Sequence, residues 1–371
     1  MADPEGQAAA RNLPVAGALK LLPQRQPNIS AARNAGIAAA AGEIVAFIDD
    51  DAVPEPTWVS AVLGAFEVPD VAAITGPVLG RNGISLQWGP LAVNGLAQDV
   101  PIDPNSLIRD GFARKLQGTN MAFRRSVLED IGGFDEAFSF YLDDTDMAWR
   151  IGQSDLRTVW APGAVVHHGF KASTRRTDAR VPLSLFDIGA SSVVYLRKHA
   201  PEDQRAEALH ALEAGQSTRL LRLAKARKLD ATKMRALMDS LRDGIEAGKT
   251  RESVEPVIGS NPDAFDPFRP NNPPPQKVLS GRRFQLRRLR KEAAAQLAKG
   301  QPVSLFAFEP TPRKHRIQFT DGGWWEQTGG LFGPSDRNGP RVQFTTFQTR
   351  LAKEIRRISA TRGLTPGEDH K

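Results

Sequence analysis

Short apolar runs alternate with amphipathic segments over residues 14–170 of this 371-residue chain. The runs ALKLL (18–22), EIVAFI (43–48) and VAAITGPVL (71–79) have the length and composition of strands. The segments ISAARNAGIAAAAG (29–42), TWVSAVLGAFE (57–67) and RRSVLEDIGG (124–133) have the pattern of helices. This alternation predicts an α/β sheet, in which ligands gather beyond the carboxyl ends of the strands.

The rest of the chain has three different patterns. Residues 184–250 are predicted to be helical, with Asp230 as a cap and one apolar face that serves packing, formed by Met234, Leu237, Met238, Leu241 and Ile245. The Pro-rich stretch 251–275 predicts a linker. A basic helix is expected over 281–300, followed by four strand-like pieces, VSLFAFEP (303–310), HRIQF (315–319), GWWEQTGG (323–330) and RVQFTTF (341–347).

Composition and charge narrow the class of protein. The chain has no cysteine, which excludes disulfides and thiolate metal sites. It has no signal-peptide pattern and no apolar run near the ~20 residues of a membrane span, so a cytoplasmic protein is expected. The 96 residues from Gln276 onward hold 19 Lys and Arg against 8 Asp and Glu, whereas the chain as a whole has a net charge of +7. The basic character therefore belongs to the tail, and an anionic partner is expected there.

Three consecutive aspartates, Asp49 to Asp51, directly follow the apolar run 43–48. Asp49 and Asp51 lie two residues apart, so both carboxylates point the same way if the chain is extended. Such a pair suits Mg²⁺ or Mn²⁺. Because Pro54 and Pro56 follow at once, a solvated turn explains the same residues equally well, and the local pattern leaves both open. An EF-hand is excluded, since its glycine and late glutamate are missing.

A second acidic cluster, Asp143, Asp144 and Asp146, opens a predicted helix in LDDTDMAWRI. Capping and the helix dipole account for one or two of these carboxylates. The cluster stands in order with three other motifs: SAARNAGIAAAAGEIVAFIDDD (30–51), GTNMAFRRSVLEDIGGFDE (118–136) and VVHHG (165–169). With these four motifs in this order and spacing, residues 20–200 resemble the family 2 glycosyltransferases of the GT-A fold.

The resemblance implies an α/β, Rossmann-like GT-A sheet. It places a glycosyltransferase domain at residues 14–200, followed by a helical extension at 201–250, the linker at 251–275 and a small basic α+β module at 276–371. Members of this family begin with a strand and a P-T-Y-N-like turn, then a second strand that ends in a base-reading Asp. Neither motif precedes Asp49 here. We therefore expect a domain that lacks the usual N-terminal strands, either because the start lies upstream or because the chain is a shortened relative.

Metal-ligand roles follow from the resemblance. In this family a divalent cation offsets the charge of the departing nucleoside diphosphate. Asp49 and Asp51 are then the metal-side pair, and Asp50 is a neighbour or a ribose contact. Some relatives use a histidine at the VVHHG position as a third ligand. His167 and His168 would face opposite ways along a strand, and the 24-residue spacing from Asp144 favours His168 as that ligand.

The second acidic motif implies the general base. The acceptor hydroxyl must lose a proton as it attacks the anomeric carbon, and the family position for that base maps to Asp144. Asp143 stands where many members have Glu, and Asp146 is expected to be structural or to orient the acceptor. One base without a separate nucleophile implies single displacement with inversion.

Three further residues are candidates for donor contacts. Arg33 either touches the donor diphosphate or is a solvated helix arginine. Thr119 and Asn120 stand where the family lines the donor sugar and the acceptor.

The expected function is a metal-dependent transfer of a hexosyl or rhamnosyl group, with Mg²⁺ or Mn²⁺ as cofactor. The donor is a nucleotide sugar, the acceptor a hydroxyl-bearing sugar or a lipid-linked molecule, and the setting bacterial surface polysaccharide or glycoconjugate synthesis. Two alternatives remain: a catalytically inactive relative that acts as a binding or scaffold module, and a nucleic-acid-binding protein acting through RRFQLRRLRK (282–291). No recognised nucleic-acid module accompanies that run.

The basic tail is expected to act semi-independently beyond its linker. If the acceptor is lipid-linked, the tail can contact the anionic inner face of a membrane, with Phe284, Leu286 and Leu289 entering the headgroup region. The alternative is that this helix packs on its own β module.

Overall fold

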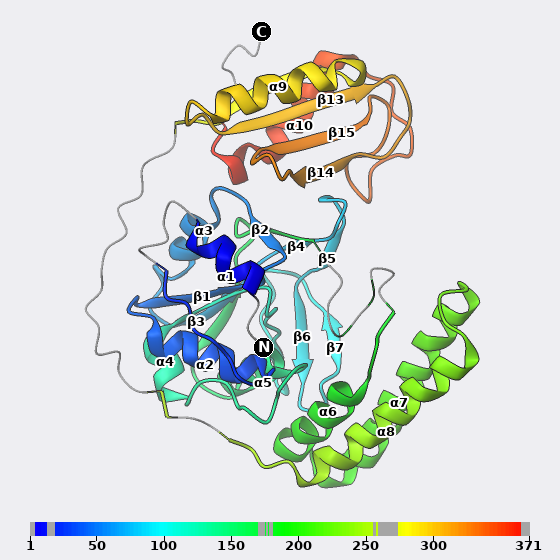
Figure 1. Cartoon of the computed structure of the whole chain (residues 1–371). Coiled ribbons are helices and arrows are strands. Elements are labelled where there is room, and N and C mark those ends of the chain that lie inside the picture. Colours follow the sequence, from blue (N-terminus) through cyan, green and yellow to red (C-terminus); the bar gives the residue numbers. More distant parts are fainter. Residues whose placement is uncertain are drawn as a thin grey trace.

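A computed structural model of the chain describes residues 4–12, 19–169, 175, 177, 181–254, 257–258 and 274–364. Its elements form a central α/β domain, a helical arm and a C-terminal α/β module, seen in Figure 1 at the middle, the lower right and the top. A short helix, α1 (Pro4–Arg11), comes first. Among the described helices, none combines the length and the apolar character that crossing a membrane requires.

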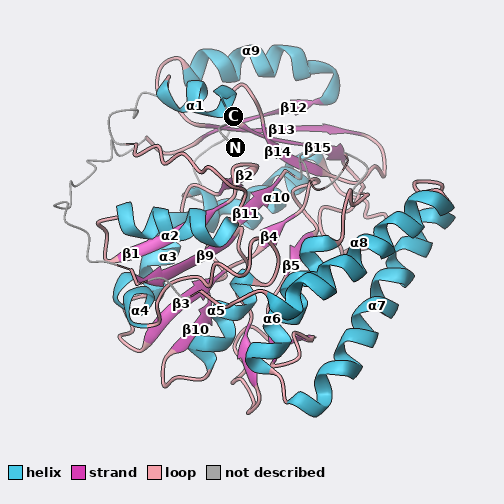
Figure 2. Ribbon diagram, turned by 60° about the horizontal axis from the view of Figure 1, so that its bottom comes forward, coloured by secondary structure: helices cyan, strands magenta, loops and turns pink. Residues whose placement is uncertain are grey.

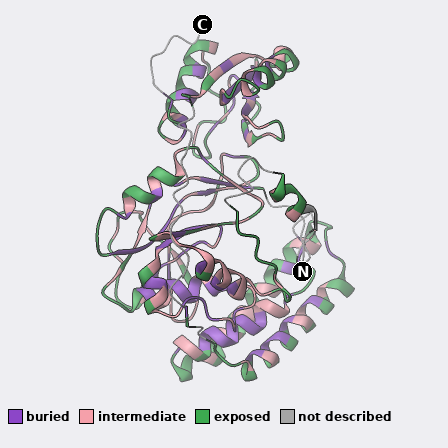
Figure 3. Ribbon diagram, turned by 60° about the vertical axis from the view of Figure 1, so that its left-hand side comes forward, coloured by how far each residue is buried: buried purple, intermediate pink, exposed green. Residues whose placement is uncertain are grey.

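The central sheet has the strand order β1-β9-β3-β10. Its strands are β1 (Ile44–Ile48), β9 (Asn120–Arg124), β3 (Val71–Thr75) and β10 (Arg157–Trp160). β10 lies parallel to β3, whereas β9 runs antiparallel to both β1 and β3. The middle strands β9 and β3 are almost wholly buried, whereas the edge strands β1 and β10 are mostly intermediate or exposed (Figure 3). The predicted α/β class is confirmed.

Helices cover both faces of this sheet (Figure 2). α2 (Ile29–Ala39), α4 (Arg125–Asp130) and α5 (Asp143–Gly152) pack on one face, and α3 (Trp58–Ala65) packs on the other. The alternation of side chains along a strand explains the two cores. On β9, Met121 and Phe123 enter the first core, and Ala122 enters the second. The predicted helices over 29–42, 57–67 and 124–133 are confirmed; α2 is shorter at its C-terminal end, and α3 and α4 are shorter at both ends.

Two smaller sheets flank the central one. One has the order β2-β11-β4-β5 and the other the order β7-β6-β8. Their strands are β2 (Ala52–Pro54), β11 (Val166–His168), β4 (Val78–Leu79), β5 (Leu86–Trp88), β6 (Leu91–Asn94), β7 (Asp99–Pro101) and β8 (Phe112–Arg114). The predicted run 71–79 is therefore divided between β3 and β4.

The helical arm consists of α6 (Phe186–His199), α7 (Glu202–Lys225) and α8 (Ala231–Thr250). The predicted apolar face of α8 packs against the other two helices. Asp230 caps α8 as expected, because its carboxylate accepts the Lys233 N–H at 2.8 Å. α6 and α8 approach closely at Gly244, where an added Cβ would collide with the carbonyl oxygen of Phe186.

The C-terminal module is a four-stranded sheet between two helices. β12 (Lys277–Arg282), β13 (Val303–Glu309) and β15 (Trp325–Gly330) run parallel, and β14 (Arg316–Phe319) pairs antiparallel with β15. A 3₁₀ turn (Arg283–Gln285) leads from β12 into α9 (Leu286–Leu297), and α10 (Phe347–Arg362) comes last. Alternate residues of β13 face the two helices, with Leu305 and Ala307 under α9 and Phe306 and Phe308 under α10.

Two predicted strands are wrong. Leu19 to Leu22 of the run ALKLL have no strand partner, and Leu19, Leu21 and Leu22 are 39–45% exposed. Residues 341–346 are also irregular, and Phe344 is 86% exposed. Both segments have strand-like composition, but a strand exists only where a neighbouring strand supplies the hydrogen-bond ladder.

The sequence interpretation also missed β12 and α10. α10 begins after Thr346, whose side chain caps the helix by accepting the Thr349 N–H at 3.2 Å. Its buried residues Leu351, Ile355 and Ile358 recur at helical spacing, so the signal was present in the sequence.

The membrane-facing role expected for Leu286 and Leu289 is also wrong. Leu289 is 2% exposed and Leu286 packs against the same core, because α9 turns its apolar face onto the sheet. Phe284, which is 85% exposed, is the one residue of the three that faces solvent.

The module packs directly on the central domain, in contrast to the expected semi-independent tail. Thr57 N–H donates to Thr361 O at 3.1 Å, and Ile317 N–H donates to Asn82 O at 2.8 Å. Buried Glu55 accepts two hydrogen bonds from Arg362, at 2.7 and 3.0 Å. Burial alone would raise the pKa of Glu55, but His167 and Arg362 lower it to about 2. The carboxylate is thus held charged between the two units.

Buried His315 predicts an acid-sensitive module. Its side chain is enclosed among Gln327, Gly330 and Arg350, and burial together with the Arg350 charge lowers its pKa to about 4. The unfolded chain, with an imidazole pKa of about 6.5, binds the proton more tightly. The contribution of neutral His315 to the free energy of unfolding is therefore fully present above about pH 6.5. We expect up to ~3 kcal/mol of it to be lost as the pH falls from about 6.5 to about 4.

Urea unfolding of the full chain between pH 4 and pH 7.5 checks this expectation. His315→Gln cannot take the proton, so its stability should fall less steeply over that interval even if it is lower at pH 7.5. Equal slopes for the two proteins would contradict the assignment to His315.

Candidate active site

The three aspartates lie in the turn between β1 and β2. Donor atoms of Asp49, Asp51 and His168 all lie within 4.8 Å of one another. His168 Nε2 is 2.9 Å from Asp51 Oδ1 and 3.8 Å from Asp49 Oδ2. Asp50 is exposed and is not one of the three clustered residues. The structure thus brings together the three residues expected to bind metal and leaves Asp50 at the rim.

The β2–β11 ladder holds two of these residues in register. His168 pairs with Ala52, directly after Asp51, and Gly169 N–H donates to Asp51 O at 2.6 Å. Because side chains alternate along β11, His167 points to the opposite face, where its Nε2 is 2.8 Å from Glu55 Oε1. Of the two histidines, only His168 lies on the side of the aspartates.

Neighbours on β5 orient the His168 ring. Gln87 Oε1 lies 3.4 Å from His168 Nδ1, and the Trp88 ring centroid is 5.6 Å from that of His168. With Nδ1 turned toward Gln87, Nε2 is directed at the two carboxylates. The side chain of His168 is 4% exposed, so this orientation is enclosed by protein. No pattern in the sequence indicated Gln87 or Trp88.

Asp144 stands in the first turn of α5, which begins after two strained residues. Tyr141 and Leu142 have positive φ angles of 74° and 65°, in the left-handed region that costs energy for residues with a Cβ. Asp144 Oδ2 accepts the Gly118 N–H at 2.8 Å, and Oδ1 accepts the Thr145 hydroxyl at 3.1 Å. The carboxylate is therefore fixed by both its backbone setting and its hydrogen bonds.

Arg33 lies between the two acidic motifs. It forms an ion pair with Asp143, and its side chain is 9% exposed. Its guanidinium carbon lies 5.3 Å from the Phe134 ring centroid. Burial lowers the pKa of Arg33, while the charges of Asp144 and Asp49 oppose that shift. The solvated-arginine alternative is therefore wrong, and Arg33 supplies a buried positive charge close to both motifs.

Thr119 and Asn120 have different environments. The Thr119 hydroxyl donates to Asp49 and so joins the first acidic motif. Asn120 is fully buried, and its amide bonds Trp58 Nε1 at 2.9 Å and Ala164 O at 2.7 Å. This amide ties α3 to the loop after β10, which corrects the expectation that Asn120 lines the donor sugar and acceptor.

Asp146 belongs to a buried charge network. It accepts from Arg150 Nε at 2.8 Å and lies 2.7 Å from His199 Nε2 and 3.2 Å from Lys198 Nζ. The residue is fully buried, and its partners on α6 attach the helical arm to α5. Of the two roles expected for Asp146, the structural one fits this environment.

Lys115 is a site residue that the sequence did not indicate. Its ammonium lies 2.6 Å from Asp99 Oδ2. Burial lowers its pKa, but the carboxylates of Asp144 and Asp99 outweigh this effect and raise it. Lys115 thus keeps a positive charge near Asp144.

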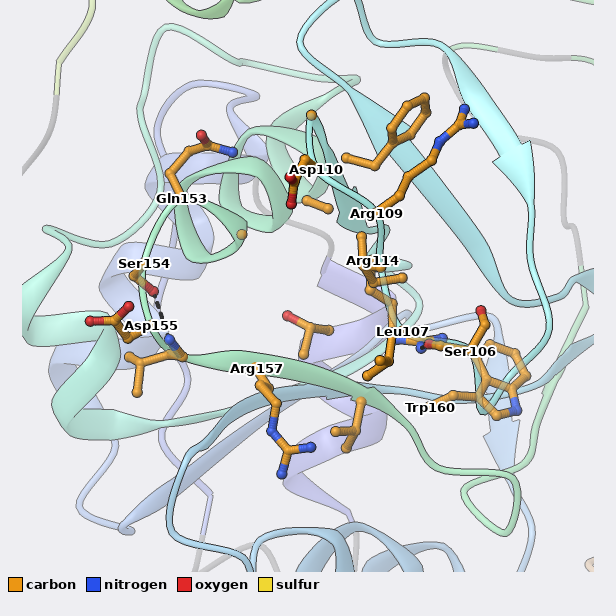
Figure 4. A pocket seen from close by; sticks show the side chains of 18 of the residues that line it. Ser106, Leu107, Arg109, Asp110, Arg114, Gln153, Ser154, Asp155, Arg157 and Trp160 are labelled. Carbon is orange, nitrogen blue, oxygen red and sulfur yellow. Dashed lines mark hydrogen bonds between the residues drawn. The ribbon is translucent and has the colours of Figure 1, made fainter.

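A cavity of about 750 Å³ lies elsewhere in the domain, between residues 104–114 and 152–160. Figure 4 shows Asp110, Asp155 and Arg157 around it. Arg157 is already paired with Asp70 at 2.6 Å. The lining residues come from the loop before β8, from β8, from the C-terminal end of α5 and from β10. The acidic motifs lie in the turn after β1 and in the first turn of α5, and none of their residues lines the cavity.

Comparison with known families decides the identity of the central domain. The family model described as Glycosyl transferase family 2 matches residues 17–132. This segment of the chain belongs to the family 2 glycosyltransferases. The matched segment includes the first acidic turn and Arg33, Thr119 and Asn120, and it ends before α5.

Curated relatives of this glycosyltransferase domain have related activities. The chain is 30% identical over 156 residues to the pre-mycofactocin glycosyltransferase of Mycobacterium tuberculosis, covering 41% of this chain and 32% of that protein. It is 38% identical over 64 residues to the N-acetylglucosaminyl-diphospho-decaprenol L-rhamnosyltransferase of the same organism, covering 17% and 21%. The chain thus spans about a third or less of the length of these relatives.

A solved structure aligns more distantly. A crystal structure of GalNAc-T7 with UDP, GalNAc and Mn²⁺ covers 53% of this chain and 39% of its own, at 13% identity and a TM-score of 0.40. At that level of similarity the alignment carries no argument about the ligands of this glycosyltransferase domain.

Proposed function

We propose that the protein transfers a sugar from a nucleotide-diphosphate donor to a hydroxyl acceptor, with inversion and with dependence on Mg²⁺ or Mn²⁺. The observation that carries the proposal is the meeting of Asp49, Asp51 and His168, beside a buried Arg33 on which the charges of both Asp49 and Asp144 act. Two carboxylates and one imidazole within 4.8 Å fit a single divalent cation. When bound, such an ion stabilises the negative charge of a departing nucleoside diphosphate.

The protein's own groups account for the other steps. Asp144 takes the proton of the acceptor hydroxyl while the acceptor oxygen forms a bond to the anomeric carbon. At the same time the bond between the anomeric carbon and the diphosphate oxygen breaks. Gly118 N–H and the Thr145 hydroxyl hold the Asp144 carboxylate in place for this transfer. Arg33 adds positive charge between base and leaving group, and direct contact of Arg33 with the diphosphate is part of the proposal. A single displacement of this kind inverts the anomeric configuration.

The relatives support a class of substrate. A hydroxyl-bearing sugar or a lipid-linked molecule as acceptor, and a hexosyl or rhamnosyl donor, fit the names of the curated relatives. The setting we propose is the synthesis of a bacterial surface polysaccharide or glycoconjugate.

The test is turnover of nucleotide sugars. Purified full-length chain is incubated with a panel of UDP-, GDP- and dTDP-sugars, with Mn²⁺ or with a chelator, and release of nucleoside diphosphate is measured. Metal-dependent release with at least one donor is expected, and NMR of the glycosylated product reports inversion. Donor binding without release under all conditions would instead identify a binding module and contradict the proposal.

Peripheral contact with an anionic membrane is a separate prediction for α9. Exposed Phe284 lies among exposed Arg283, Arg287 and Arg288. Each basic residue near such a surface contributes up to about 1 kcal/mol. We expect salt-sensitive sedimentation with anionic vesicles that Phe284→Ser together with Arg287→Ser reduces. Equal sedimentation with neutral vesicles would contradict it.

A further inference from the structure

The face of β11 opposite the candidate metal site is covered by the C-terminal module. His167, on that face, lies against Trp325 of β15, with ring centroids 4.6 Å apart. Arg362, at the end of α10, lies with its guanidinium carbon 4.4 Å from the Trp325 ring centroid. The side chains of Arg362 and Trp325 are both 3% exposed or less. Two residues of the module are therefore fully enclosed against the strand that carries His168.

Glu55 joins these contacts to the acidic turn. It directly follows β2, and its N–H donates to Val165 O at 2.9 Å, just before β11. Its carboxylate accepts both Arg362 hydrogen bonds and contacts His167 Nε2 at 2.8 Å. One buried carboxylate thus fixes the relative position of β2 and β11. Asp51 lies one residue before β2, and His168 lies on β11.

The 2.9 Å separation of His168 Nε2 and Asp51 Oδ1 depends on the register of this short ladder. The β2–β11 pair has only three paired positions and the β11–β4 pair has two, so these short ladders depend on further contacts to hold their geometry. Removing the Arg362 guanidinium would leave the Glu55 carboxylate buried beside His167 without its cation. Because an unpaired buried charge is unfavourable, the neighbouring ends of β2 and β11 would then move.

We infer that Arg362 and Trp325 are positioning residues for the metal site, acting through Glu55 and His167 on the β2–β11 pair. This inference rests on the proposed function for the assignment of Asp51 and His168 as metal ligands. The contacts that link Arg362 and Trp325 to these residues do not depend on it. The C-terminal module then contributes to metal binding, because its contacts on the opposite face of β11 set the distance between two metal ligands.

The test compares two arginines of the same module. Arg362→Met removes the bond to Glu55 and keeps the length of the side chain. Arg290→Met is the matched control: Arg290 bonds buried Glu326 at 2.7 and 2.8 Å, and Glu326 faces away from Trp325 on β15. Mn²⁺ affinity of the full chain is measured by titration calorimetry. We expect Arg362→Met to weaken binding about tenfold or more, and Arg290→Met to leave it unchanged.

Trp325→Leu is the second variant, because it leaves the Glu55–Arg362 pair intact and no unpaired charge behind. It should also weaken Mn²⁺ binding, by a few-fold. Unchanged affinity in both Arg362→Met and Trp325→Leu overturns the inference, and so does an equal loss in Arg290→Met, which would mean a general loss of stability.

A readout without metal separates this inference from the proposed function. The imidazole Cε1–H resonance of His168, assigned with His168→Gln, should shift in Arg362→Met at fixed pH and remain in place in Arg290→Met. If the unaltered chain binds no Mn²⁺, the metal dependence in the proposed function is wrong, and this resonance alone decides the positioning role. A resonance that does not move overturns it.

Discussion

Asp51→Ala is expected to abolish Mn²⁺-dependent binding of a nucleoside diphosphate. The change removes the carboxylate that lies 2.9 Å from His168 and leaves Asp49 and His168 as the remaining donors of the three. Two donors hold a divalent cation much less tightly than three. Turnover should fall as well, because several kcal/mol of charge stabilisation at the leaving diphosphate are lost. Calorimetric titration with UDP or GDP, with and without Mn²⁺, measures the effect.

Asp50→Ala provides the matched control for this experiment. Asp50 is the adjacent residue of the same turn, carries the same charge and is exposed outside the cluster. Its loss lowers the local negative charge equally, so a purely electrostatic effect would appear in both variants. Metal-dependent binding should persist in Asp50→Ala, with a moderate loss of donor affinity if Asp50 touches the ribose. Persistence of metal dependence in Asp51→Ala would rule out the proposed ligand set.

Local patterns predicted the central domain better than the C-terminal module. The helices over 29–42 and 57–67 have an apolar face and clear ends, and both are present as α2 and α3. The runs ALKLL (18–22) and RVQFTTF (341–347) have an equally strand-like composition, but their described residues 19–22 and 341–346 have no partner strand. Strand formation is decided by pairing between distant segments, which composition does not encode. The aromatic and β-branched residues directly before α10 are typical of a strand, and this pattern obscured the start of the helix.

The same contrast holds for the candidate site. The two-residue spacing of Asp49 and Asp51 is local and predicted their common orientation. The alternation along β11 likewise separates His167 from His168. The burial of Asn120 depends on Trp58 and Ala164, which are distant in the sequence, so its structural role was hidden.

The contact of Arg362 with Glu55 joins residues 307 positions apart, across a Pro-rich stretch that predicted separation. Local sequence thus encodes which groups can perform the chemistry, and long-range packing decides which of them reach the site.

Asp144→Asn is expected to reduce turnover by ~10²–10⁴ while donor affinity changes little. Asparagine keeps the size of the side chain, and its oxygen can still accept the Gly118 N–H that Asp144 accepts at 2.8 Å. The amide cannot take a proton from the acceptor hydroxyl, so only the chemical step should suffer. Steady-state turnover and calorimetric donor affinity, both measured in the same Mn²⁺ buffer, separate the two effects.

Asp143→Asn distinguishes the base from its neighbour. Asp143 forms an ion pair with Arg33, so its carboxylate already has a buried partner. Its amide variant breaks that pair, frees the Arg33 charge and should alter donor binding as well as turnover. Asp144→Asn should instead leave binding intact and lose turnover alone. Near-normal turnover in Asp144→Asn, with the loss confined to Asp143→Asn, would assign the proton transfer to Asp143 and leave Asp144 with a structural role.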